Sequence, residues 1–149
     1  MSTEEGRFLG LDLGESRVGV ALSDPLGITA QPIGHLDRKG KPKIVDAIRA
    51  LVNEHGVTRI VVGLPLRLSG EAGPEAVAAE TFAQRLRGAF PRVTVDLWDE
   101  RLSTAEVERM MIAADVSRKK RRRKVDTLAA VVILQSYMDA RVTTLGDER

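Results

Sequence analysis

The fold is decided by the stretch Phe8-Leu-Gly-Leu-Asp-Leu-Gly-Glu-Ser-Arg-Val-Gly-Val-Ala-Leu-Ser23. It begins and ends with short apolar runs, and the polar residues 14–17 between them have the length of a hairpin turn. Asp24-Pro25 marks a second turn, after which residues 28–33 are expected to form a third strand. The chain therefore opens with an antiparallel meander.

Beyond residue 40 the apolar residues recur with helical spacing. They predict a helix over residues 41–54, which Gly56 ends. The remaining segments are interpreted in the same way, as strands over 57–62 and 93–98 and helices over 74–90, 103–114 and 125–141. Strand-helix-strand crossovers add parallel strands and place helices on both faces of the sheet. We therefore expect a three-layer α/β/α domain with a mixed five-stranded sheet.

The composition excludes several classes of protein. With 149 residues, of which 43% are apolar and 30% charged, the chain has the make-up of one ordinary soluble domain. Cysteine is absent, which excludes disulfides and thiolate metal sites. The first eight residues contain no apolar run, and the longest one, 128–134, is far shorter than a membrane span. We therefore expect a cytoplasmic protein.

Seven consecutive cations stand out in this chain. The formal net charge is +2, from 23 basic and 21 acidic residues, so without the run the rest of the chain is acidic. Mutual repulsion of seven like charges favours an anionic partner over a solvated loop. Because there are few aromatic residues, we expect contacts with nucleic-acid phosphates rather than base stacking. The run consists of Arg118, Lys119, Lys120, Arg121, Arg122, Arg123 and Lys124.

Three carboxylates are candidates for chemistry. Asp12 interrupts an apolar strand, where an ionised group loses hydration at a cost of several kcal/mol. Glu100 follows the strand 93–98 at its carboxyl end, where open α/β sheets bind ligands. Asp126 lies in the first turn of the last expected helix. Each also has a purely structural interpretation. Asp12 could cap a turn, Glu100 could form a surface ion pair, and Asp126 could interact with the helix dipole.

Oxygen-only ligands from three distant segments suit Mg²⁺ or Mn²⁺. Two such ions activate a water molecule and stabilise the leaving oxygen of a phosphodiester displacement. Adjacent residues on a strand face opposite sides, so Asp99 and Glu100 do not both aim at one ion if the strand continues through them. The sequence thus predicts metal-assisted phosphodiester hydrolysis.

Short blocks in a fixed order cover nearly the whole chain: Gly10-Leu-Asp-Leu-Gly14, Arg17-Val-Gly-Val-Ala21, Ser23-Asp-Pro25, Val61-Val-Gly-Leu-Pro65, Asp99-Glu-Arg-Leu-Ser-Thr104, Lys124-Val-Asp126 and Ile133-Leu-Gln-Ser-Tyr137. Jointly they resemble the YqgF family, also called RuvX. The resemblance implies a ribonuclease H-like fold and a bacterial nuclease. Family members are linked to maturation of the 5′ end of the small-subunit ribosomal RNA precursor, and are also described as Holliday junction resolvases.

By motif, the three carboxylates Asp12, Glu100 and Asp126 match the acidic metal-binding set of this family. RuvC-type resolvases commonly place a second acidic residue one helical turn after the last aspartate, and here that position is Ala129. The difference implies that one ion is held tightly and a second is recruited with the substrate. It also weakens the expectation of a junction-resolving role.

Three arginines outside the basic run are candidates for binding the substrate because of their positions in the sequence. Arg17 and Arg101 adjoin the expected ligands, and either bind the scissile phosphate or pair with carboxylates. Arg67, in the loop after a central strand, is a further candidate for a contact with the nucleic-acid backbone. We expect one ribonuclease H-like domain over residues 1–149, with flexible ends at about 1–6 and 142–149 and a basic loop at 117–124.

Two other functions remain open from the sequence. A strand followed by Asp-x-Gly and a hairpin also occurs in sugar-kinase and actin-like phosphotransferases, although these bind nucleotide between two such domains. A non-catalytic RNA-binding module that uses the basic run as its anchor is the other alternative, and it predicts salt-sensitive binding that is independent of Asp12. Whether the protein is a monomer or a homodimer is left undecided.

Overall fold

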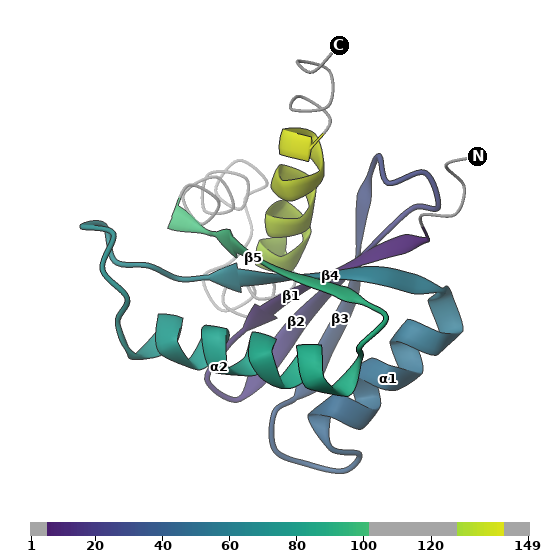
Figure 1. The fold of residues 1–149 in the computed structure, drawn as a ribbon, viewed down its shortest axis with the longest axis horizontal. Helices are drawn as coiled ribbons and strands as arrows, with labels where there is room; N and C mark the ends of the chain where they lie inside the picture. Colours follow the sequence, from purple (N-terminus) through teal and green to yellow (C-terminus); the bar gives the residue numbers. More distant parts are fainter. Residues whose placement is uncertain (1–5, 102–127, 142–149) are drawn as a thin grey trace, which may run out of the picture.

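The computed structural model describes residues 6–101 and 128–141. Five strands form one sheet in the order β3-β2-β1-β4-β5, with helices on both of its faces (Figure 1). The elements in chain order are β1 (Arg7–Leu13), β2 (Arg17–Ser23), β3 (Ala30–Asp37), α1 (Ile44–His55), β4 (Val57–Leu64), α2 (Pro74–Ala89), β5 (Thr94–Asp99) and the helical residues 128–141.

The sheet has the mixed topology expected from the sequence. β1, β2 and β3 pair antiparallel, whereas β4 lies parallel to β1 and β5 lies parallel to β4. The expected helix over residues 103–114, the first residues of the last expected helix and the basic loop at 117–124 lie outside the described residues. Within the described part, the mixed five-stranded α/β architecture is confirmed.

The third strand was expected over residues 28–33, and this boundary is wrong because β3 spans Ala30–Asp37. The Asp24 carboxylate accepts hydrogen bonds from the backbone N–H groups of Ile28 (2.7 Å) and Thr29 (2.9 Å), which holds the segment before Ala30 as a turn. Further along, a register shift between Val20 and Ala21 lets pairing with β2 continue to the end of β3.

α1 also begins later than expected, at Ile44 instead of residue 41. Lys43 has an extended backbone, with φ −61° and ψ 151°, so the helical conformation starts only after it. Gly56 ends α1 with a left-handed conformation (φ 63°), as its position in the sequence predicts. The other described strands and α2 lie within two residues of their expected bounds.

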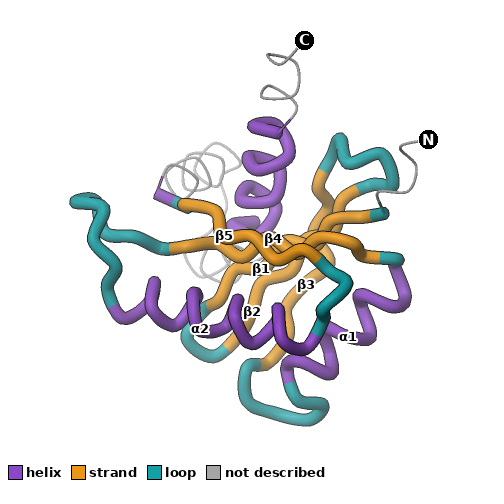
Figure 2. Tube along the Cα trace, in the orientation of Figure 1, coloured by secondary structure: helices purple, strands orange, loops and turns teal. Residues whose placement is uncertain are grey.

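Two apolar cores cover the two faces of the sheet. Figure 2 shows the helices α1 and α2 on one face and the helical residues 128–141 on the other. On one face α1 and α2 pack against strand residues such as Leu9, Leu11 and Ile60. On the other face the helical residues 128–141 pack against the opposite sides of the same strands, including Phe8 and Val61. Strand residues buried on both faces explain the nearly continuous apolar runs of β1 and β4.

The helical residues 128–141 lie in close contact with β1. A Cβ atom on Gly10 would be 2.8 Å from the Leu134 Cβ and 3.0 Å from the Ala130 carbonyl oxygen, so only glycine fits beneath this helix. The same face of β1 then leads to Asp12, two residues after Gly10. The contact therefore places residues 128–141 next to the end of β1 that carries a candidate carboxylate.

A polar cluster fixes the helical residues 128–141 to β4 and β5. The Arg59 Nη1 donates hydrogen bonds to the Asp96 Oδ2 (2.7 Å) and to the Tyr137 hydroxyl (3.1 Å), and that hydroxyl donates to Asp96. Burial raises the pKa of Tyr137, which keeps the donating proton in place. Trp98 packs edge-on against the Tyr137 ring at 5.5 Å between centroids. The cluster thus combines a charge pair with aromatic packing.

Replacing Tyr137 by phenylalanine tests this cluster. We expect the free energy of unfolding to fall by about 1–2 kcal/mol, because Asp96 and Arg59 each lose a partly buried hydrogen bond. Urea unfolding followed by circular dichroism measures the change, with an unaltered m-value. The matched control Ser69→Ala, at an exposed loop position, should leave stability within about 0.5 kcal/mol. Equal stability of Tyr137→Phe and the wild type would contradict the assignment.

Candidate active site

The candidate site lies where β1, β4 and β5 reach their carboxyl ends. Leu11 pairs with Val62, and Gly63 pairs with Trp98, so Asp12, Gly63 and the residue after β5 come to one edge of the sheet. Side chains alternate along each strand, which puts Asp12 on the face that packs against residues 128–141. Three neighbouring strands therefore deliver their ends to one place.

The structure brings two of the three candidate carboxylates into contact. The side chains of Asp12 and Glu100 are hydrogen-bonded to each other, although 88 positions separate them in the chain. The backbone N–H of Glu100 donates to the Leu64 carbonyl oxygen (3.2 Å), which holds this residue in line with β5. A hydrogen bond between two carboxyl groups requires a proton on one of them.

The protonation of this pair follows from its surroundings. Burial raises the pKa of Glu100 to about 7, against the opposing effect of the hydrogen bond with Asp12, and the negative charge of Asp99 raises it further. Glu100 is half-buried, and this partial loss of hydration disfavours its ionised form. A carboxyl group with a pKa near neutrality beside a second carboxyl group is typical of a functional site.

Gly63 makes the space that the Glu100 carboxyl group occupies. A Cβ atom at this position would overlap the Glu100 Oε2 and would lie 2.6 Å from the Ile133 Cδ1. Sequence analysis includes Gly63 in the block Val61-Val-Gly-Leu-Pro65 but assigns it no place in the site, because its role depends on which residues the register places beside it. The glycine is therefore a site residue that sequence analysis missed, and the strand pairing is the only signal that reveals it.

The donor set of the pair fits a hard divalent cation. Asp12 and Glu100 offer carboxylate oxygens alone, and Mg²⁺ and Mn²⁺ prefer such ligands. Across residues 6–101 and 128–141, no group of three or more His, Cys, Asp or Glu side chains is arranged to hold a metal ion. Asp126 lies outside the described residues. Within the described residues, the candidate donors are therefore the carboxyl groups of Asp12 and Glu100.

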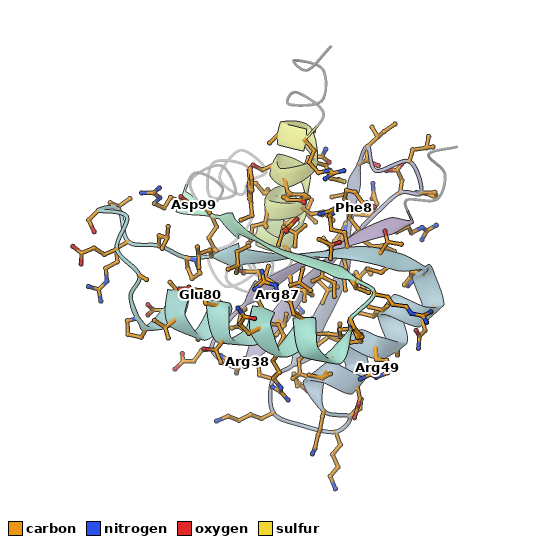
Figure 3. All side chains as sticks on the ribbon, in the orientation of Figure 1. Phe8, Arg38, Arg49, Glu80, Arg87 and Asp99 are labelled. Atoms are coloured by element: carbon orange, nitrogen blue, oxygen red, sulfur yellow. The ribbon has the colours of Figure 1, made fainter. Side chains whose placement is uncertain are left out.

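Asp99 is bound to an arginine. The Arg101 guanidinium contacts both carboxylate oxygens, with Nε 2.8 Å and Nη2 2.6 Å from the Asp99 Oδ2. This hydrogen-bonded contact lowers the pKa of Asp99. Figure 3 shows Asp99 at the carboxyl end of β5, far along the sheet from Phe8. Of the two roles considered for Arg101, pairing with a carboxylate is the one seen in the structure.

The other two candidate arginines lie on different elements of the fold. Arg17 opens β2, opposite Asp37 in β3, beside an open hollow of about 620 Å³ that is lined by Glu15, Ser16, Arg17, Asp37 and Lys39. Arg67 is exposed in the loop after β4, and its Nε lies 2.8 Å from the place where a Cβ on Gly73 would be. Neither Asp37 nor Lys39 was expected from the sequence, because their place at the turn follows from the β2–β3 pairing.

The seven residues of the basic run lie outside the described residues, so their predicted contact with phosphates stays a prediction. The structure does describe Ala129, the position at which RuvC-type proteins commonly carry an acidic residue. Ala129 is buried within the helical residues 128–141.

Within residues 6–101 and 128–141, no helix is both long and apolar enough to cross a membrane.

Comparison with known proteins gives a family and a fold. A family model described as "RuvX: Holliday junction resolvase" matches residues 6–140. A protein of Geobacillus kaustophilus named "Putative pre-16S rRNA nuclease" is 53% identical over 137 residues, which cover 91% of this chain and 99% of the relative. A protein of Pelotomaculum thermopropionicum with the same name is 50% identical, over 90% of this chain and 87% of the relative.

Among solved structures, Thermus thermophilus RuvC in complex with a Holliday junction substrate superimposes with a TM-score of 0.56. The alignment covers 93% of this chain and 97% of that protein, at 18% sequence identity. At this identity the likeness shows the fold alone. The ribonuclease H-like architecture implied by the sequence motifs is thereby confirmed.

Proposed function

Because this chain belongs to the RuvX family of Holliday junction resolvases, we propose that it is a divalent-metal-dependent nuclease that hydrolyses phosphodiester bonds. The observation that carries the proposal is the contact between the Asp12 and Glu100 carboxyl groups at the ends of β1 and β5. The names of relatives that are about 50% identical support pre-16S ribosomal RNA as the substrate, and the proposed role is processing of its 5′ end in the cytoplasm.

Each carboxylate has a distinct proposed task. Asp12 is the central ligand of Mg²⁺ or Mn²⁺, and Glu100 is a second ligand that also orients the attacking water. The bound ion supplies the acidity that makes a water molecule nucleophilic at neutral pH. Asp126 closes the far side of the site. It precedes Ala130 by four residues, which is at most about 14 Å of chain, and the Ala130 carbonyl contacts Gly10.

Cations around the pair are proposed to bind the nucleic-acid backbone. Arg17 is the first residue of β2, Arg67 lies in the loop after β4, and Arg101 lies directly after Glu100. The basic run at residues 118–124 precedes Asp126 by two to eight positions, so phosphates attracted to it lie near the proposed ligands. These contacts hold the substrate while the carboxylates act on one phosphodiester.

Branched DNA is a second candidate substrate, and the description of the family model favours it. A resolvase cuts two strands at a junction and therefore needs two sites, which requires a homodimer. The position of Ala129, where RuvC-type proteins commonly carry an acidic residue, speaks against this alternative. We therefore place ribosomal RNA first.

An assay with both substrates tests the proposal. Purified protein with Mn²⁺ or Mg²⁺ is expected to cleave a pre-16S RNA fragment faster than a four-way DNA junction, and to stop when the ion is chelated. In Asp12→Asn the rate should fall at least about 1,000-fold, because the central ligand is lost, whereas RNA binding should change less than threefold. Cleavage by Asp12→Asn at the wild-type rate would contradict the assignment of Asp12 as the central metal ligand. RNA binding without any metal-dependent cleavage would indicate a binding module instead.

A further inference from the structure

The loop between β4 and α2 ends in a tight turn. The backbone N–H of Gly70 donates to the Arg67 carbonyl oxygen (2.7 Å), and the Arg67 N–H donates to the Glu71 carbonyl oxygen (3.0 Å). Gly70 has a φ of +91°, a conformation that side-chain-bearing residues rarely adopt. Leu68 and Ser69 are therefore the two central residues of a hydrogen-bonded turn, which fixes the direction of their side chains.

Leu68 stands almost entirely in solvent at this turn. It is 92% exposed, the highest value among the exposed large hydrophobic residues of the described chain. Single exposed leucines are common on protein surfaces, so exposure alone carries no conclusion. The centre of a tight turn, however, is a position where polar residues are the norm, and this one presents an apolar side chain on a fixed backbone.

The turn adjoins the carboxyl pair and carries both signs of charge, because Arg67 is followed by Glu71 and the nearby Arg101 is paired with Asp99. Leu68 follows Arg67 directly, and the Arg101 Nη1 lies 3.6 Å from the position of a Cβ on Gly70. At the base of the loop, the Leu64 carbonyl oxygen accepts the backbone hydrogen bond of Glu100. In Figure 1 the loop extends from the sheet at the carboxyl end of β4, beside the end of β5. An apolar tip thus lies next to the proposed nuclease site.

We propose that Leu68 is a wedge that inserts between two neighbouring bases of the bound RNA strand, while the adjacent Arg67 contacts a neighbouring phosphate. Nucleic-acid-binding proteins use apolar side chains in this way to unstack a base step. The inference rests on the proposed function for the location of the bound strand. It names the preferred substrate as a strand whose bases separate easily, such as a single-stranded or unpaired segment, and not a regular duplex.

The length of the loop limits where the wedge acts. Leu68 lies five residues after Gly63, which is at most about 17 Å of extended chain. At about 3.4 Å per nucleotide along a stacked strand, this reach corresponds to about five nucleotides. The unstacked step is therefore expected within five nucleotides of the phosphate that lies at Asp12 and Glu100.

The test uses a fluorescent base whose emission rises when it is unstacked. Single-stranded pre-16S RNA fragments carry 2-aminopurine at successive positions and are titrated with wild-type protein in metal-free buffer. We expect emission to rise at least twofold at one or two adjacent positions. Leu68→Ala should abolish this rise and weaken binding at least fivefold, whereas Leu68→Phe should retain both. The matched control is Leu26→Ala, which removes a 78% exposed leucine from the β2–β3 connection, and it should behave as wild type.

The outcomes separate the wedge from the nuclease activity. An unchanged emission profile and affinity in Leu68→Ala would overturn the wedge, even for a protein that cleaves RNA normally. Emission that rises in the wild type and is lost in Leu68→Ala would support the wedge, even if no metal ion produces cleavage. An affinity loss in Leu68→Ala with no change in emission at any position would also overturn it, since the leucine would then contact RNA without separating bases.

Discussion

A Gly63→Ala variant is expected to lose at least about 100-fold in metal-dependent cleavage while retaining its affinity for RNA. The added methyl group would overlap the Glu100 Oε2 and come within 2.6 Å of the Ile133 Cδ1. The carboxyl group is the more mobile of the two neighbours, so it is displaced from Asp12. A displacement of about 1 Å at reacting groups is enough for a loss of this size.

The same substitution should also lower the free energy of unfolding by about 1–3 kcal/mol, because the site is closely packed against the helical residues 128–141. Single-turnover cleavage and urea unfolding measure the two effects separately. The matched control is Gly88→Ala in α2, where a Cβ meets no atom within 4 Å, and which should gain up to about 1 kcal/mol without loss of activity. Full activity in Gly63→Ala would contradict the view that this glycine makes room for Glu100.

Most of the fold follows from local sequence patterns, because the period of the apolar residues changes wherever a strand gives way to a helix. The crossover rule then places the strands in one sheet. The bounds of the third strand could not be predicted in this way. Its start depends on the hydrogen bonds of the Asp24 carboxylate, and apolar content alone does not show them.

Less of the candidate site than of the fold could be predicted from the sequence. Asp12 and Glu100 were found because each is unusual in its own segment, but their contact depends on the parallel register of three strands. Gly63 was noted only as part of a motif, because its contact with Glu100 depends on the strand beside it. The Gln135 side chain illustrates the same limit: it accepts from the Ala30 N–H (2.9 Å) and donates to the Ile28 carbonyl (2.8 Å), more than 100 positions away.

Glu100→Gln is expected to abolish cleavage and, without metal ions, to stabilise the fold above pH 7. The pKa of Glu100 is about 7 in the folded protein against an ordinary value of 4.5, so the folded state binds the proton more tightly than the unfolded chain. Wild-type stability is therefore unaffected by this group below about pH 4.5, falls as the pH rises to about 7, and stays lowered above it. The difference is on the order of 3 kcal/mol.

Glutamine carries no charge at any of these values of pH, so the variant should lack this fall in stability between pH 5 and 8. Urea unfolding of both proteins in chelating buffer at several pH values measures the difference, and Glu80→Gln, an exposed position in α2, is the matched control. Adding Mn²⁺ should stabilise the wild type at pH 8 through ligand binding to the folded state, and should have much less effect on Glu100→Gln. Parallel pH profiles of the two proteins would contradict the burial of an ionisable Glu100. If Mn²⁺ raised the free energy of unfolding of both proteins equally, Glu100 would not be a ligand of the ion. Its buried carboxylate would then lower stability without contributing to metal binding.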